Sequence, residues 1–188
     1  MLTFKQYLNE VLNNPYKWEL VKKSMRNIQY RFTTDSGIEY NVELDRLGEN
    51  LDWDLYFSIS ATSRKELDKD NDDVFKISGT GDQFRVFATV QDIVKDFITK
   101  KKPNVIEFSA ADPTEPSRRR LYSAFTANFE KSQPELFLTY IAWSIGNGAD
   151  NGKYNFIMNR KFAKKVLNGP TTSFFYNKIP SGYRDELR

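Results

Sequence analysis

The alternation of apolar and polar positions is clearest in the first third of the chain. Residues 28–34 and 38–44 both alternate with the period of a half-buried β-strand. The Asp35-Ser36-Gly37 sequence between them supplies turn residues, so the two segments predict a β-hairpin. Residues 53–60 repeat the alternation and predict a third strand. We therefore expect this part of the chain to build an antiparallel sheet.

Apolar positions at helical spacing precede the predicted sheet. Residues 3–12 carry apolar side chains three and four positions apart, behind Thr3, a residue type that can cap a helix. Pro15 interrupts this pattern, and residues 16–25 predict a second short helix. Residues 1–25 are thus expected to form an N-terminal helical segment.

The period changes after a polar loop at residues 63–73 and a short strand predicted at residues 74–78. From Val86 onward the apolar positions fall on one face of a helix, and Pro103 ends that helix. The apolar face is formed by Val86, Val90, Ile93, Val94, Phe97 and Ile98.

The last part of the chain predicts a further strand, a second long helix and a terminal hairpin. Residues 104–110 form the fifth strand, and Pro116 fits the first turn of the helix that follows. Residues 136–145 and 153–159 predict two strands joined by a glycine-rich turn. A short helix is expected at residues 160–167.

The composition excludes several classes of chemistry. The 188-residue chain contains no cysteine and no histidine, so disulfides, thiolate metal sites and serine–histidine or cysteine–histidine mechanisms are impossible. Acid–base chemistry would fall to carboxylates, tyrosine, lysine or the backbone. The formal net charge of +3 is too small to indicate nucleic-acid binding by itself. No apolar run approaches the roughly 18 residues that span a membrane, so we expect no membrane partner.

An acidic stretch raises the question of a metal site. Asp68, Asp70 and Asp72 follow the spacing of a calcium loop. The pattern then fails, because Asp73 stands where the tight turn requires glycine and Gly79 stands where the bidentate glutamate belongs. We therefore expect a solvated acidic loop and no metal.

The predicted order is three antiparallel strands, a fourth strand, a loop, a helix, a fifth strand, a helix and a terminal hairpin. This order resembles that of the GNAT acyltransferases, which move acyl groups from acyl-CoA to amines. The resemblance covers residues 30–161 and rests more on topology than on residues. It implies an α+β fold with a mixed, mostly antiparallel sheet flanked by helices. The domain would occupy residues 26–168, and residues 169–188 would be a C-terminal extension.

In the GNAT family, a Gln/Arg-x-x-Gly-x-Gly/Ala sequence after the fourth strand holds the CoA pyrophosphate through backbone N–H groups at a helix N-terminus. The resemblance implies four cofactor positions here, Gln83, Arg85, Val86 and Ala88. Gln83 and Ala88 fit the pattern, but Val86 replaces the middle glycine, and its Cβ would crowd the approach of a phosphate. We therefore expect that the chain binds no cofactor. If the chain is an enzyme instead, its cofactor would be acetyl-CoA.

The second landmark of the family is an aliphatic-tyrosine pair in the helix after the fifth strand, whose tyrosine acts as general acid. Leu121 and Tyr122 occupy that place, so the resemblance implies Tyr122 as the acid. The alternative is a half-buried helix residue with its hydroxyl at the surface. A carboxylate would have to deprotonate the amine through water, and Glu107 and Asp73 are the candidates.

The first ten residues resemble the capsid-targeting leader of proteins packaged in the heads of T4-like phages. In that family a prohead protease cuts after a short aliphatic-x-Glu motif, which Leu8-Asn9-Glu10 fits. The resemblance implies processing at Leu8 and Glu10, in a protein of the host cytoplasm or of the interior of the phage head. The alternative is an ordinary helix docked on the sheet.

Basic residues are the remaining candidates. Arg118, Arg119 and Arg120 begin a predicted helix, where guanidinium groups and backbone donors could receive a phosphate. Successive helix residues point about 100° apart, so the alternative is a solvated face with one arginine paired to an acidic neighbour. Further basic residues at 100–102 and 160–165 would form a nucleic-acid surface if they converged, although no recognised motif is present.

Three functions remain open from the sequence. The favoured one is a phage accessory protein with a degenerate GNAT-like fold that acts by binding a host or phage protein. The second is an active acyl-CoA-dependent N-acyltransferase that uses Tyr122 and Glu107. The third is a nucleic-acid-binding phage protein that uses the basic helices.

Overall fold

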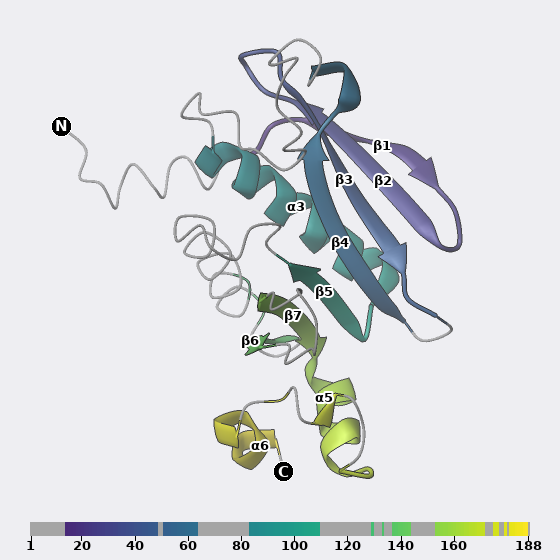
Figure 1. The fold of residues 1–188 in the computed structure, drawn as a ribbon, viewed down its shortest axis with the longest axis vertical. Coiled ribbons are helices and arrows are strands. Elements are labelled where there is room, and N and C mark those ends of the chain that lie inside the picture. The colour runs from purple at the N-terminus through teal and green to yellow at the C-terminus, as the bar shows by residue number, and fades with distance from the viewer. Residues whose placement is uncertain are drawn as a thin grey trace, which may run out of the picture. The chain divides into compact units, whose positions relative to one another are not determined.

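The computed structural model describes residues 14–48, 51–63, 83–109, 129, 133, 137–143, 153–171, 175, 176, 179 and 181–187. The chain divides into two compact units, each drawn from two stretches of sequence. The first unit comprises residues 1–46 and 54–102, and the second comprises residues 47–53 and 103–188. Both can be followed in Figure 1.

The first unit contains an antiparallel meander. Its strands are β1 (Trp18–Lys23), β2 (Asn27–Thr33), β3 (Glu39–Arg46) and most of β4 (Asp52–Ile59), and they lie in the order β1-β2-β3-β4. β1 pairs with β2 and β2 pairs with β3 in antiparallel fashion. Along β2 and β3 every second side chain is buried, as the alternation in the sequence predicts. The predicted hairpin and third strand are confirmed.

The helix predicted at residues 16–25 is wrong, because this part of the chain forms the strand β1. The strand has an irregularity between Leu20 and Lys22, where one extra residue shifts the register against β2. Such a bulge breaks the period of two, so the alternation that marks a strand is absent from the sequence. Trp18 shows what holds the segment extended: its ring packs edge-on against Tyr30 at 5.4 Å, and its Nε1 donates a 2.8 Å hydrogen bond to Asp92. Contacts with residues distant in sequence thus outweigh local helical spacing.

Helix α3 (Gln83–Lys101) packs its apolar face against this meander. Each residue of the predicted helical face is buried, from Val86 to Ile98, and Phe87 meets Phe57 of β4 edge-on at 5.4 Å. The helix begins three residues before the predicted start. It ends at Lys101. The next residue, Lys102, closes the last turn before Pro103 with a positive φ of 49° and a 2.9 Å hydrogen bond from its N–H to the Ile98 carbonyl.

The second unit contains three strands and two helices. The strands β5 (Val105–Ser109), β6 (Phe137–Trp143) and β7 (Lys153–Asn159) lie in the order β5-β7-β6, and both pairs are antiparallel. Two helices follow, α5 (Arg160–Leu167) and α6 (Ser181–Leu187). The fifth strand, the terminal hairpin strands and the helix at 160–167 are confirmed. Helix α6, which is not predicted from the sequence, lies within the expected C-terminal extension.

The fold is α+β, as predicted, with antiparallel strand pairs and helices packed on them. The helix predicted at residues 3–12, the strand at 74–78 and the body of the helix that begins near Pro116 lie outside the described residues. The domain boundaries at residues 25 and 168 stay a prediction. Within the described ranges, no helix is long and apolar enough to cross a membrane.

Candidate functional site

The first unit carries a groove of about 640 Å³ at one end of its meander. The start of β1, the end of β2, the start of β3 and the first turn of α3 meet there. The groove is lined by Tyr16, Lys17, Trp18, Glu19, Arg31, Phe32, Thr33, Asp35, Glu39 and Arg85. Its lining combines three aromatic with six charged side chains, a composition more charged than that of a typical small-molecule pocket.

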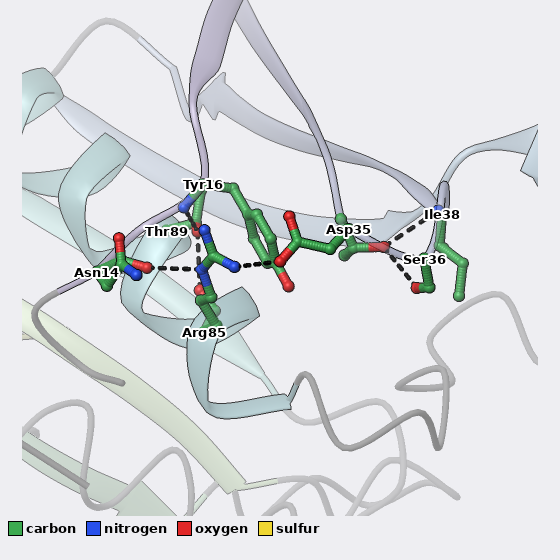
Figure 2. A network of polar contacts seen from close by, with 8 residues as sticks. Asn14, Tyr16, Asp35, Ser36, Ile38, Arg85 and Thr89 are labelled. Carbon is green, nitrogen blue, oxygen red and sulfur yellow. Dashed lines mark hydrogen bonds and ion pairs between the residues drawn. The ribbon is translucent and has the colours of Figure 1, made fainter. Parts of the chain in front are cut away.

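Arg85, in the first turn of α3, is the centre of a polar network at this end of the unit, drawn in Figure 2. Its Nε donates a 2.9 Å hydrogen bond to the backbone carbonyl of Asn14, and its terminal nitrogen is ion-paired with the Asp35 carboxylate. The guanidinium also lies 3.9 Å from the ring centroid of Tyr16, in a cation–π contact. One side chain therefore ties α3 to the segment before β1 and to the β2–β3 turn.

Thr89 and Tyr16 complete the attachment of the segment before β1. The backbone N–H of Tyr16 donates to the Thr89 hydroxyl at 2.8 Å, and that hydroxyl donates to the Arg85 carbonyl one turn back, also at 2.8 Å. The Tyr16 ring is 4% exposed and stacks on Phe32 at 6.0 Å. The contacts bury Tyr16 between the helix and the sheet, which fixes the position of the groove wall.

The turn that presents Asp35 is itself held by hydrogen bonds. The Thr34 hydroxyl accepts a 3.1 Å bond from the Ile38 N–H and lies 2.8 Å from the Ser36 hydroxyl. Gly37 has a φ of +84°, a backbone conformation that favours glycine, and its N–H donates to the Thr34 carbonyl. A rigid turn therefore holds Asp35 against Arg85, although the Asp35 side chain is 75% exposed.

The charges that line the groove balance. Three are basic, Lys17, Arg31 and Arg85, and three are acidic, Glu19, Asp35 and Glu39. Arg31 and Glu39 approach to 3.5 Å, and Arg85 is paired with Asp35. A surface with both signs does not create the single-sign field that attracts a polyanion, so it suits a partner that itself carries both charges.

Three of the four predicted cofactor positions have described side chains, and all four lie within α3. Gln83 is the first residue of the helix, Arg85 belongs to the network, and the side chains of Val86 and Ala88 are 0% and 3% exposed. The Val86 side chain thus points into the apolar core of the unit instead of standing beside the helix start. Arg85 makes three contacts within the protein, so its charge is already compensated.

The remaining predicted site residues lie in the second unit or outside the described residues. Glu107 lies on β5 in the second unit, half-buried and opposite Phe156 of β7. Tyr122, the arginines Arg118, Arg119 and Arg120, and the proposed processing residues Leu8 and Glu10 lie outside the described residues. Among the described residues there is no group of three or more acidic side chains that could hold a metal ion.

The sheet of the first unit also holds a perturbed carboxyl group on β4. Burial raises the pKa of Asp54 above its usual range, and the negative charge of Asp45 raises it further, while the hydrogen bond from the Tyr56 hydroxyl lowers it. Asp45 in turn accepts a 2.6 Å hydrogen bond from the Asn27 side-chain amide. These two neighbouring carboxylates carry like charge, which makes this part of the sheet sensitive to pH.

Sequence reasoning missed Asn14, Tyr16, Asp35 and Thr89 as members of the site. Asp35 is read from the sequence as a turn residue and Tyr16 as part of a helix. The residues that meet at Arg85 are 71 positions away at Asn14 and 50 positions away at Asp35. A pattern confined to neighbouring positions carries no signal for such pairs.

The chain matches a protein-family model and is similar to a solved structure. A protein-family model described as "Family of unknown function (DUF6934)" matches residues 13–163. No curated protein sequence matches the chain. Among solved structures, the chain is similar to the spermidine N-acetyltransferase SpeG of Vibrio cholerae in a mutant form, with 12% sequence identity and a TM-score of 0.43. That match covers 74% of this chain and 69% of the other.

Proposed function

We propose that this chain, which belongs to the DUF6934 family of unknown function, acts by binding a partner protein and not by transferring an acyl group. The observation that carries the proposal is the state of Arg85. Its guanidinium is already engaged by Asp35, Asn14 and the Tyr16 ring, at the place where the GNAT resemblance would require a phosphate-binding sequence.

Binding of a pyrophosphate at the start of α3 would compete with these contacts. An arginine that turned towards a phosphate would have to leave a carboxylate, a backbone carbonyl and an aromatic ring. The middle glycine of the family sequence is also replaced by Val86, whose buried side chain anchors the helix in the core. Both features favour a helix start that serves the fold.

The groove is the surface that we assign to the partner. It is open, aromatic side chains contribute to its lining, and its charges are of both signs. An extended polypeptide segment with mixed charges meets these requirements better than a small anion does. The partner would be a host or phage protein.

Isothermal titration calorimetry with acetyl-CoA and with CoA tests the proposal. We expect no heat of binding up to millimolar cofactor, because the start of α3 is occupied by contacts within the protein. The variant Arg85→Ala serves as the matched control, since it removes the contacts of the guanidinium while leaving Val86 in place. Micromolar binding of either cofactor by the wild-type chain would contradict the proposal and favour an active N-acyltransferase.

A role in the phage particle is the finer part of the proposal, and it rests on the resemblance of the first ten residues to a capsid-targeting leader. If the leader is cleaved, the protein in mature particles begins after Glu10. N-terminal sequencing or mass spectrometry of protein from purified particles measures this directly. An intact Met1 in those particles, or absence of the protein from them, would refute the packaged form.

A further inference from the structure

Helix α5 has one apolar face and one basic face. Its buried side chains are Ala163, Val166 and Leu167. Lys161, Lys164 and Lys165 are exposed, and their spacing of three and four positions places them on one side of the helix. No acidic residue occurs within the helix sequence. We call these three side chains the α5 lysine face.

The helix that carries this face is firmly held within its unit. The Asn159 side chain caps it, accepting hydrogen bonds from the N–H groups of Lys161 at 3.0 Å and Phe162 at 3.3 Å. At the other end, the N–H of Gly169 donates to the Val166 carbonyl at 3.1 Å. The α5 lysine face is therefore presented by a fixed element that follows β7 directly, as Figure 1 shows.

The apolar side of α5 is already used. Its buried residues join a core formed with the strands β5 and β7 and with α6, including Phe156, Met158 and Leu187. Phe162 packs edge-on against Phe175 at 5.6 Å. An interfacial helix binds a bilayer by inserting its apolar face, and α5 has none to insert. The surface it offers consists of ammonium groups.

The three ammonium groups are not compensated by the described carboxylates. Within the described part of the chain, the ion pairs involve Arg31, Arg85 and Lys100, and none involves the α5 lysine face. Lys161 and Lys165 form a like-charge pair at a spacing of four, which weakly destabilises a helix. A closely spaced row of anions would relieve that repulsion.

We infer that the α5 lysine face binds the phosphate backbone of duplex DNA without regard to sequence. Duplex DNA offers one negative charge per roughly 1.7 Å of helix axis, so several phosphates can meet adjacent lysines. Single strands are typically held by bases stacked on exposed aromatic rings, and the only aromatic residue of α5, Phe162, is packed against Phe175. The α5 lysine face lies in a different unit from the groove, and its binding of DNA does not depend on whether acyl-CoA binds.

Fluorescence anisotropy with a labelled 20-base-pair duplex tests the inference on the full chain. Three phosphate contacts correspond to a slope of about −2.7 in a plot of log affinity against log salt. Affinity should then fall by about 40-fold between roughly 50 mM and 200 mM salt. The triple variant Lys161→Gln, Lys164→Gln, Lys165→Gln should lose at least tenfold in affinity at the lower salt concentration, and its slope should approach zero.

A matched variant removes the same charge elsewhere. Lys22, Lys23 and Arg26 are exposed around the β1–β2 turn of the first unit, and their replacement by Gln should leave affinity within about twofold. Circular dichroism melts establish that both variants fold. Equal losses in the two variants would show a net-charge effect and overturn the inference. Absence of binding by the wild-type chain, unchanged binding by the α5 variant, or tighter binding to anionic vesicles than to duplex would overturn it as well.

Discussion

Arg85 is a single residue whose sequence position and structural contacts indicate different roles. By its place in the sequence it resembles part of a cofactor-binding stretch. By its contacts it joins three segments, since it bonds to the Asn14 carbonyl, pairs with Asp35 and covers the Tyr16 ring. Removing it would leave the buried ring of Tyr16 without its cation and the Asn14 carbonyl without its donor. The side chain therefore stabilises the first unit.

We expect Arg85→Ala to lower the free energy of unfolding by about 1–2 kcal/mol, the sum of a cation–π contact and a charge-assisted hydrogen bond, discounted for the exposure of Asp35. Arg85→Lys should recover only part of this loss, because a lysine keeps the charge but not the planar, multi-donor group. Urea unfolding at constant m measures both variants. A loss below about 0.3 kcal/mol for Arg85→Ala would contradict the structural role.

At the scale of elements, the sequence pattern predicts what neighbouring positions decide. The alternation of β2 and β3 and the helical face of α3 are confirmed because each element buries one face and exposes the other. β1 escapes prediction because its bulge interrupts the period of two and its side chains are mostly exposed. The packing of β1 against α3 is not predicted either, since it depends on pairs such as Trp18 and Asp92 that lie far apart in the sequence.

Burial of the Asp54 carboxyl group makes stability depend on pH. Its pKa in the folded protein is raised by burial and then by the charge of Asp45. The folded protein therefore binds the proton more tightly than the unfolded chain does. This group therefore costs stability as the pH rises from its ordinary pKa through the raised one, and the cost persists above that window. Below the window both states are protonated and the cost disappears.

We accordingly expect Asp54→Asn to raise the melting temperature at pH 7 and to change it little at pH 3. Asparagine keeps a side-chain oxygen for the Tyr56 hydroxyl and has no charge to repel Asp45. Thermal unfolding followed by circular dichroism across this pH range provides the measurement. Asp45→Asn is the partner variant, since it removes only the second cause. A stabilisation of Asp54→Asn that was equal at both pH values would show that its charge is not the cause.

At the scale of the whole molecule, the α+β class and the described elements from β2 to α5 could be predicted from the sequence, whereas β1, α6 and the network at Arg85 could not. A helix such as α3 is encoded by a repeating apolar face within nineteen residues. The site instead depends on a contact between distant parts of the sequence, because the turn at Asp35 lies against Arg85 in the helix that starts at Gln83. No local pattern encodes this contact. The resemblance in the sequence therefore implies that Arg85 binds a phosphate, whereas in the structure it pairs with the Asp35 carboxylate.

We propose that contacts within the chain close the start of α3 to acyl-CoA. The most direct measurement is a titration of the ¹⁵N-labelled protein with CoA, followed through the backbone amide resonances of residues 83–89. We expect these resonances to stay unshifted up to millimolar CoA, with the Arg85 Nε–H signal retained by its hydrogen bond to the Asn14 carbonyl. Saturable shifts at Gln83 to Ala88 at micromolar CoA, together with loss of that signal, would contradict it.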